Sequence, residues 1–210
     1  FTKLNDAPTI TSSNTASVDE NLSISTVVYD GNATDVDSSD TITFSISGTD
    51  AGLFTVDSND GEVRLKTSAD FETKNSYSFN IIATDNGAGT LSTSKAVTLS
   101  VNNLNDPPSI TSGATGAIAE NASISTIAYD AQATDPDGNS ITFSLSGTDS
   151  SSFTIDSDDG EVRLKNSANF EVKNSYSINV VATDNGSTPT NSTKAITINV
   201  TDENDNPTLV

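Results

Sequence analysis

Apolar and polar residues alternate along most of this chain, which is the pattern of β-strands that bury one face. In the first half, the alternation is clear in five short runs, at 42–46, 54–56, 63–65, 77–83 and 97–101. Asp60-Gly61 separates two of these runs, because glycine accepts the positive φ of a tight hairpin turn. Two further apolar stretches lie at 9–17 and 22–33. The pattern predicts about seven strands in about 100 residues and no helix of useful length.

The whole pattern occurs twice, with a period of about 100 residues. The segment Leu4-Asn5-Asp6-Ala7-Pro8 recurs as Leu104-Asn105-Asp106-Pro107-Pro108, and a third copy, Glu203-Asn204-Asp205-Asn206-Pro207, lies near the C-terminus. The first repeat has one residue more than the second near Asp40. Three copies of a linker therefore bracket two copies of a domain.

This repeat predicts the domain boundaries. We expect a linker at 1–8, a first domain at 9–101, a linker at 102–108, a second domain at 109–200 and the start of another linker at 201–210. A chain that starts and stops inside linkers is expected to be a piece of a longer tandem array. The predicted fold class is all-β, with two tandem seven-stranded Greek-key β-sandwiches of the immunoglobulin-like kind.

Composition narrows the possible chemistry. The formal net charge is -20, and there is no His and no Cys. A strongly negative chain repels nucleic acid and anionic membrane surfaces, so neither is an expected partner. Without thiolate or imidazole, the chain lacks the usual nucleophile, general base and transition-metal ligands. Carboxylate, amide, hydroxyl and carbonyl oxygens remain, and these are the ligands that calcium prefers.

Acidic residues gather where the strand alternation stops. In the first repeat these are Glu20 and the pair Asp70 and Glu72, and in the second repeat they include the pair Asp135 and Asp137. Because residues two apart on an extended chain point the same way, each pair can direct two carboxylates at one point. A carboxylate facing a thin core would be costly without a partner, so we place these groups at the ends of the domains.

The order of these signatures resembles the calcium-binding pattern of cadherin repeats. It runs Glu, Asp-x-Glu, an Asn-Asp-x-Pro linker, Asp-x-Asp and Ala-x-Asp, and it covers the whole chain. The sequence is most similar to bacterial cadherin-like repeats of large surface adhesins, including RTX adhesins of biofilms. The resemblance implies three calcium ions between consecutive repeats.

The resemblance also implies a ligand set. For the outer ions at the central junction it implies Glu20, Asp70, Glu72, Asn103, Asp106 and the carbonyl of Leu104. For the third ion it implies Asn105, Asp135, Asp137, Asp184 and the carbonyls of Pro107 and Asn139. At the two ends of the chain it implies partial sites, formed by Asn5, Asp6, Asp35, Asp37 and Asp85 at one end and by Glu120, Glu171, Asp202 and Asp205 at the other.

The sequence departs from the family pattern at three positions. Asn103 and Lys3 stand where the family usually has Asp, whereas Asp202 keeps the acid, and Asn169 stands opposite Asp70. Each neutral replacement removes one anionic oxygen, and Lys3 adds a repelling charge. We therefore expect weaker calcium binding at the matching ions.

The resemblance implies calcium-rigidified spacer repeats of a secreted or cell-surface adhesin. Their partners would be the neighbouring repeats of the same chain, with no direct membrane contact and a monomeric state. Without calcium, the clustered carboxylates would repel one another and open the linker. The alternative is a module that binds polysaccharide or a second copy of itself.

Other functions fit less well. A glycosidase needs one acid and one base or nucleophile across a sugar cleft, and nothing in the pattern makes a cleft. Aromatic residues occupy matched positions in both repeats, for example Phe54 and Phe153, so we expect them in the core and not on sugar-binding platforms. The segment at 156–160 resembles the start of an EF-hand loop, but no Glu follows at the twelfth position, which favours a hairpin turn.

Overall fold

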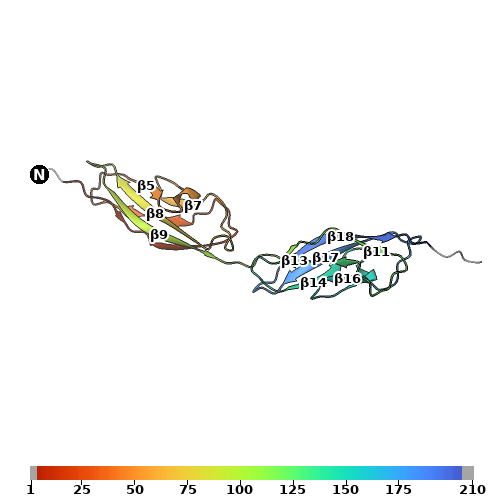
Figure 1. Ribbon diagram of the computed structural model, residues 1–210. Helices are drawn as coiled ribbons and strands as arrows, with labels where there is room; N and C mark the ends of the chain where they lie inside the picture. The colour runs from red at the N-terminus through yellow and green to blue at the C-terminus, as the bar shows by residue number, and fades with distance from the viewer. Residues whose placement is uncertain (1–3, 205–210) are drawn as a thin grey trace, which may run out of the picture. The chain divides into compact units, whose positions relative to one another are not determined.

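The computed structural model of the chain describes residues 4–204. The chain divides into two compact units, unit 1 with Phe1–Leu104 and unit 2 with Asn105–Val210. Both are built from β-strands (Figure 1). Within residues 4–204, the only helical elements are two 3-10 turns, η1 (Ala51–Leu53) and η2 (Ser150–Ser152). The predicted all-β fold class is therefore confirmed.

Residues 4–104 of unit 1 form nine strand segments arranged in two layers. A four-stranded sheet has the order β2-β9-β8-β5, a three-stranded sheet has the order β3-β7-β6, and β1 pairs with β4. The segments are β1 (Thr9–Ile10), β2 (Thr15–Asp19), β3 (Tyr29–Asp30), β4 (Ala33–Thr34), β5 (Ile42–Ser47), β6 (Phe54–Val56), β7 (Glu62–Leu65), β8 (Ser76–Asp85) and β9 (Ser92–Asn102).

These nine segments correspond to the seven predicted strands, because two of the strands are broken. The first strand leaves its partner β4 after Ile10 and joins the other sheet as β2, which pairs with β9 in parallel. The second strand is interrupted by Gly31-Asn32 between β3 and β4.

Unit 2 repeats this topology. Its sheets have the orders β11-β18-β17-β14 and β12-β16-β15, with β10 paired to β13. The segments are β10 (Ser109–Ile110), β11 (Thr115–Ala119), β12 (Tyr129–Asp130), β13 (Ala133–Thr134), β14 (Ile141–Ser146), β15 (Phe153–Ile155), β16 (Glu161–Leu164), β17 (Ser175–Asp184) and β18 (Asn191–Thr201).

The apolar positions of the alternating runs form one core in each unit. On β8, every second residue from Tyr77 to Asp85 is buried, while its neighbours are more exposed. Edge-to-face ring pairs join the two layers, such as Tyr29 with Phe79, whose centroids are 5.7 Å apart. The matched aromatic residues therefore lie in the core, as predicted, including Tyr29, Phe44, Phe54, Tyr77, Tyr129, Phe143 and Phe153.

One carboxylate in each unit anchors the 3-10 turn to the sheet. Asp149 precedes η2, accepts a hydrogen bond from the Ser177 N–H at 2.7 Å, and pairs with Lys173 at 2.5 Å. The ammonium of Lys173 also lies 4.8 Å from the ring centroid of Tyr176. The Lys173 partner first and the Ser177 N–H second hold the pKa of Asp149 below its ordinary value. Asp50, Lys74, Tyr77 and Ser78 form the same arrangement in unit 1.

The lowered pKa of Asp149 predicts an acid-dependent contribution to stability. A carboxyl group with a lowered pKa stabilises the fold above its ordinary pKa of 3.8 and loses that contribution as the pH falls through the folded value. Asp149→Asn should therefore lower the free energy of unfolding by about 1 kcal/mol at pH 7. At pH 2 the variant and the wild-type protein should differ less. Urea unfolding at both pH values measures this, with exposed Asp159→Asn as the control. An equal deficit at pH 2 and pH 7 would show that the Asp149 charge is not responsible.

Candidate metal centre

The predicted ligands collect at the two ends of each unit. We call the end that carries Glu20, Asp70, Glu72 and Asn103 the C-terminal pole of unit 1. The end that carries Asn5, Asp35, Asp37 and Asp85 is its N-terminal pole. The poles of unit 2 consist of the equivalent residues, with Glu120, Asn169, Glu171 and Asp202 at the C-terminal pole and Asn105, Asp135, Asp137 and Asp184 at the N-terminal pole.

A buried glutamate forms the base of each C-terminal pole. Glu20 follows β2 and is only 1% exposed. Asn21 then takes a φ of 61°, a conformation that Asn tolerates better than most residues, and turns the chain away from the strand. This turn leaves the Glu20 carboxylate between the loop that holds Phe71 and the start of the linker.

Both oxygens of that carboxylate accept backbone hydrogen bonds. In unit 1, the Phe71 N–H donates to Oε2 of Glu20 at 2.8 Å and the Leu104 N–H donates to Oε1 at 2.8 Å. In unit 2, the N–H groups of Phe170 and Glu203 donate to Glu120 in the same way. These donors hold the pKa of Glu120 below its ordinary value, with Phe170 contributing most. Each glutamate thus ties a loop and a linker to its unit.

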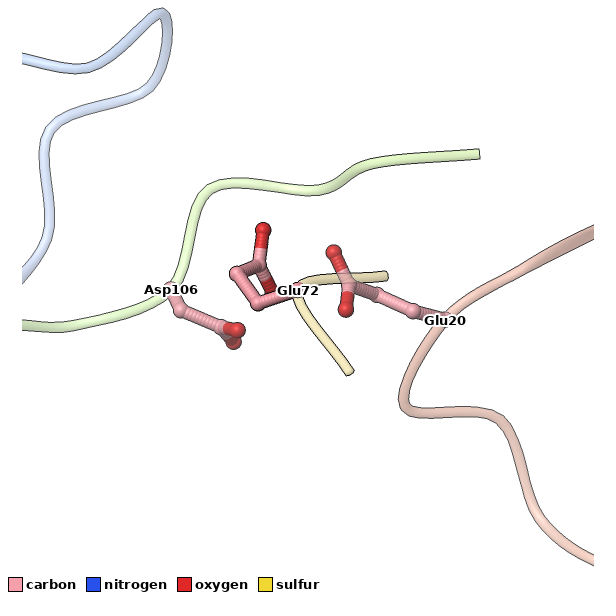
Figure 2. A group of neighbouring side chains, drawn as sticks. All are labelled: Glu20, Glu72 and Asp106. Carbon is pink, nitrogen blue, oxygen red and sulfur yellow. The ribbon is translucent and has the colours of Figure 1, made fainter. Parts of the chain in front are cut away.

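In the described part of the chain, carboxylates converge in two groups of three, and each group includes one of the buried glutamates. Oxygens of Glu120, Glu171 and Asp202 all lie within 4.8 Å of one another, and so do oxygens of Glu20, Glu72 and Asp106. Figure 2 shows the second of these groups, with its side chains reaching toward one another from three separate stretches of chain. The structure therefore brings together six of the predicted ligands.

Asp70 and Asn103 make hydrogen bonds within the pole that the sequence pattern did not indicate. Oδ1 of Asp70 accepts the Thr73 N–H at 2.8 Å and closes a turn, and Asn169 does the same for Val172 in unit 2. The amide of Asn103 donates to Glu72 at 3.4 Å. Asp202, which aligns with Asn103, belongs instead to the three-carboxylate group of unit 2. The two C-terminal poles thus differ in charge at this position.

A buried aspartate organises each N-terminal pole. Asp184 is 4% exposed and accepts hydrogen bonds from Thr190, through its hydroxyl at 2.5 Å and its N–H at 2.9 Å. The Gly186 N–H and the Asn105 amide also donate to it. The Thr190 hydroxyl is the largest of the influences that lower the pKa of Asp184 to about 2. Asp85 holds the same place in unit 1 and accepts from Gly87, Leu91 and Asn5.

The linker asparagine packs directly on a glycine of this pole. A Cβ atom on Gly186 would lie 1.6 Å from Oδ1 of Asn105, and one on Gly87 would lie 2.2 Å from Oδ1 of Asn5. The next linker residue is held through its backbone, because the Asp106 N–H donates to Oδ2 of Asp137 at 2.8 Å. The Asp6 N–H donates to Asp37 at the same distance. Gly186 and Thr190 therefore shape the pole, although neither was among the predicted site residues.

One buried carboxylate oxygen at each N-terminal pole has no hydrogen-bond partner among residues 4–204. Oδ2 of Asp35 and Oδ2 of Asp135 are buried and accept no hydrogen bond in the part of the chain that the structure describes. Their other oxygens accept backbone N–H groups, from Asp37 at 2.7 Å and from Asn139 at 3.1 Å. Leaving a buried acceptor unsatisfied costs about 1–3 kcal/mol, and a bound cation would satisfy it. The residues present thus fit an oxygen-coordinated cation such as calcium.

The assignment of all these residues as metal ligands remains a prediction. Asp205 lies outside the described residues. The carbonyls of Leu104, Pro107 and Asn139 and the side chain of Asp6 are assigned only by the resemblance.

In the described part of the chain, no helix is long and apolar enough to cross a membrane.

Sequence comparison links both repeats to one family of domains. The family model described as Cadherin domain matches residues 14–102 and 114–201. Human Protocadherin Fat 1 is 34% identical over 202 residues, which cover 91% of this chain and 4% of that protein. Human Protocadherin-1 is 32% identical over 159 residues, which cover 74% of this chain and 15% of that protein. The chain therefore spans only a small part of these relatives.

Solved structures show the same fold. Human Protocadherin-24 EC1-2 aligns with a TM-score of 0.67 at 22% identity, over 95% of this chain and 100% of that one. Mouse Cadherin-23 EC22-24 aligns with a TM-score of 0.59 at 26% identity, over 94% of this chain and 65% of that one. A cis-dimer structure of Protocadherin gammaB7 EC3-6 aligns with a TM-score of 0.57 at 25% identity, over 97% and 54% of the two chains.

Proposed function

The chain belongs to the cadherin family, and from this premise we propose that its two repeats are calcium-rigidified spacers in an extracellular adhesion protein. The family consists of adhesion modules and not of enzymes, which agrees with the lack of His and Cys. The observation that carries the proposal is the group formed by Glu120, Glu171 and Asp202. Three carboxylates with oxygens within 4.8 Å of one another are a strong attractant for a divalent cation.

The charge of these groups supports a calcium-dependent change in the linker. Two unit charges about 4 Å apart repel by about 1 kcal/mol in water and by more where solvent is excluded. Asp106 is the linker member of the group with Glu20 and Glu72, so repulsion acts directly on the linker. Bound calcium would supply the opposite charge and accept six to eight oxygen ligands.

Hydrogen bonds to the linker support a short pivot. The Leu104 N–H is tied to Glu20 of unit 1. The Asn105 amide donates to Asp184, and the Asp106 N–H donates to Asp137, both in unit 2. The residues on either side of the Leu104–Asn105 peptide are thus anchored by their own units, and this peptide is also where the two units divide. Rotation about the bonds flanking it is the freedom that calcium would remove.

We assign the protein to the cell surface or the extracellular space, with the neighbouring repeats of the same chain as its partners. The relatives compared above are animal proteins, so a bacterial adhesin context rests on the sequence resemblance alone. Binding to a second copy is the alternative that a comparison favours, since one similar structure is a cis-dimer. Sedimentation in millimolar calcium distinguishes these two functions. A monomer supports the spacer, and a dimer supports binding to a second copy.

Small-angle scattering of the whole chain tests whether calcium fixes the angle between the two units. The distribution of interatomic distances should be narrow in calcium and broad in chelator. Asp106→Ala removes one ligand from the linker and should raise the calcium concentration at the midpoint of this change about tenfold, because calcium affinity follows the number of charged ligands.

Asp60→Ala is the matched control, since Asp60 lies in the hairpin between β6 and β7 and carries the same charge. It should leave the midpoint unchanged. A distribution of interatomic distances that stays the same when calcium is removed would rule out a calcium-dependent change in the linker. Equal midpoints for the two variants would rule out Asp106 as a ligand.

A further inference from the structure

The additional residue of unit 1 lies in the loop at its N-terminal pole. The Asp6 N–H donates to Asp37, and the Thr41 N–H donates to Asn86, in unit 1. In unit 2, the same bonds join Asp106 to Asp137 and Ser140 to Asn185. Three residues, 38–40, therefore connect points that two residues, 138–139, connect in unit 2. Asp40 is the last of the three.

In unit 2, the two-residue loop supplies a hydrogen-bond donor to the linker asparagine. The side-chain amide of Asn139 donates to Oδ1 of Asn105 at 2.8 Å. The amide nitrogen of Asn105 in turn donates to Asp184. Both ends of the Asn105 side chain are thus satisfied by neutral or complementary partners.

In unit 1, the longer loop places a carboxylate where unit 2 has this donor. A Cβ atom on Gly87 would lie 2.2 Å from Oδ1 of Asn5 and 2.4 Å from Oδ2 of Asp40. These two oxygens are therefore separated by no more than the sum of those distances. The amide nitrogen of Asn5 is directed at Asp85, with both oxygens at 3.2 Å, so the Asn5 atom facing Asp40 is its oxygen.

Two acceptors that face each other repel, because neither carries a hydrogen to share. Within residues 4–204, no hydrogen bond reaches the side chain of Asp40 or Oδ1 of Asn5. On the same loop, Oδ2 of Asp35 is buried and accepts no hydrogen bond from any described residue. Asn5 and Asp40 both line an open cavity of about 260 Å³, together with Asp37, Ser39, Gly87 and Ala88.

We propose that Asp40 is an additional anionic ligand for a divalent cation at the N-terminal pole of unit 1. This inference rests on the proposed calcium function and adds a residue outside the predicted ligand set. A cation in the cavity would turn the repulsion between Asp40 and Asn5 into shared coordination. The pole of unit 1 then has four carboxylates, from Asp35, Asp37, Asp40 and Asp85, where unit 2 has three.

Calcium titration followed by NMR of the whole chain tests the proposal at each pole separately. The N–H groups of Gly87 and Gly186 donate to the central aspartates of the two poles, so their resonances report on units 1 and 2 respectively. Asp40→Asn keeps the shape and removes the charge. This variant should raise the calcium dissociation constant measured from the Gly87 resonance about tenfold and leave the constant measured from Gly186 unchanged. Asn139→Asp adds a carboxylate at the equivalent place in unit 2 and should lower the calcium dissociation constant measured from Gly186.

Asp60→Asn controls for the loss of one negative charge elsewhere in unit 1. If Asp40→Asn shifts the Gly87 constant no more than this control does, Asp40 is not a ligand. A response at Gly186 without one at Gly87 in the wild-type protein would also overturn the inference, while leaving the calcium function intact. If neither glycine responds to calcium, the proposed function itself fails. Spectra in chelator establish that each variant is folded.

Discussion

The melting temperature should rise by about 6–20 °C when calcium at about 10 mM replaces chelator. Extracellular calcium modules have dissociation constants of about 0.1–1 mM, so this concentration is up to about 100 times the constant. A ligand that binds only the folded state at that excess adds about 2.7 kcal/mol per independent site. Each kcal/mol shifts the melting temperature of a domain of this size by about 4–8 °C.

Magnesium is the matched control for this increase. It requires near-octahedral geometry at about 2.1 Å and gives up its water reluctantly. The oxygens of Glu120, Glu171 and Asp202 come from three separate segments and suit a larger, more adaptable ion. Circular dichroism at equal concentrations of the two ions measures the difference. Equal melting curves in calcium and in chelator would contradict the metal assignment, and equal shifts in both metals would contradict the preference for calcium.

The second large effect is expected from the buried glutamate of unit 1. Glu20→Ala leaves the N–H groups of Phe71 and Leu104 without their acceptor. Each unsatisfied buried donor costs about 1–3 kcal/mol, so unit 1 should lose about 3 kcal/mol of unfolding free energy even in chelator. Glu20→Gln keeps one acceptor oxygen and should lose less. Urea unfolding in chelator measures both variants.

Asp60→Ala is the exposed control and should change the unfolding free energy by less than about 0.5 kcal/mol. Hydrogen exchange adds a local measurement, because the Leu104 N–H should lose its protection in Glu20→Ala and keep it in the control. If Glu20→Ala is as stable as the wild-type protein in chelator and less stable than it only in calcium, the glutamate acts as a metal ligand and not as an anchor for the linker.

The alternating pattern was sufficient for the fold class. β8 illustrates why, since its buried positions follow the apolar residues at every second place. The breaks in the first two strands were not predictable in the same way. Where the first strand leaves β4 and joins β9 depends on which sheet edges are available, and that is a property of the assembled sandwich.

The candidate site was predicted as a set of residues but not as a set of contacts. Glu20 and Glu120 were assigned as ligands, and the structure adds that both oxygens of each accept backbone N–H groups. Those donors lie about 50 and 83 residues away in the chain, so local spacing contains no information about them. Thr190 was also absent from the predicted set, although it is close to Asp184 in the chain, because its contact depends on the shape of the turn between β17 and β18.

The number of repeats, the strand period and the residue types that could bind a hard cation were all predictable before the fold was known, because they depend on composition and on short-range alternation. Which oxygens meet depends on the folded sandwich. Folding brings Glu120, Glu171 and Asp202 within 4.8 Å of one another, whereas Asp70 closes a turn and Asp40 faces the oxygen of Asn5. The physical reason is that charge and polarity are properties of single residues, but coordination depends on distances between residues that the sandwich packs together from distant parts of the chain.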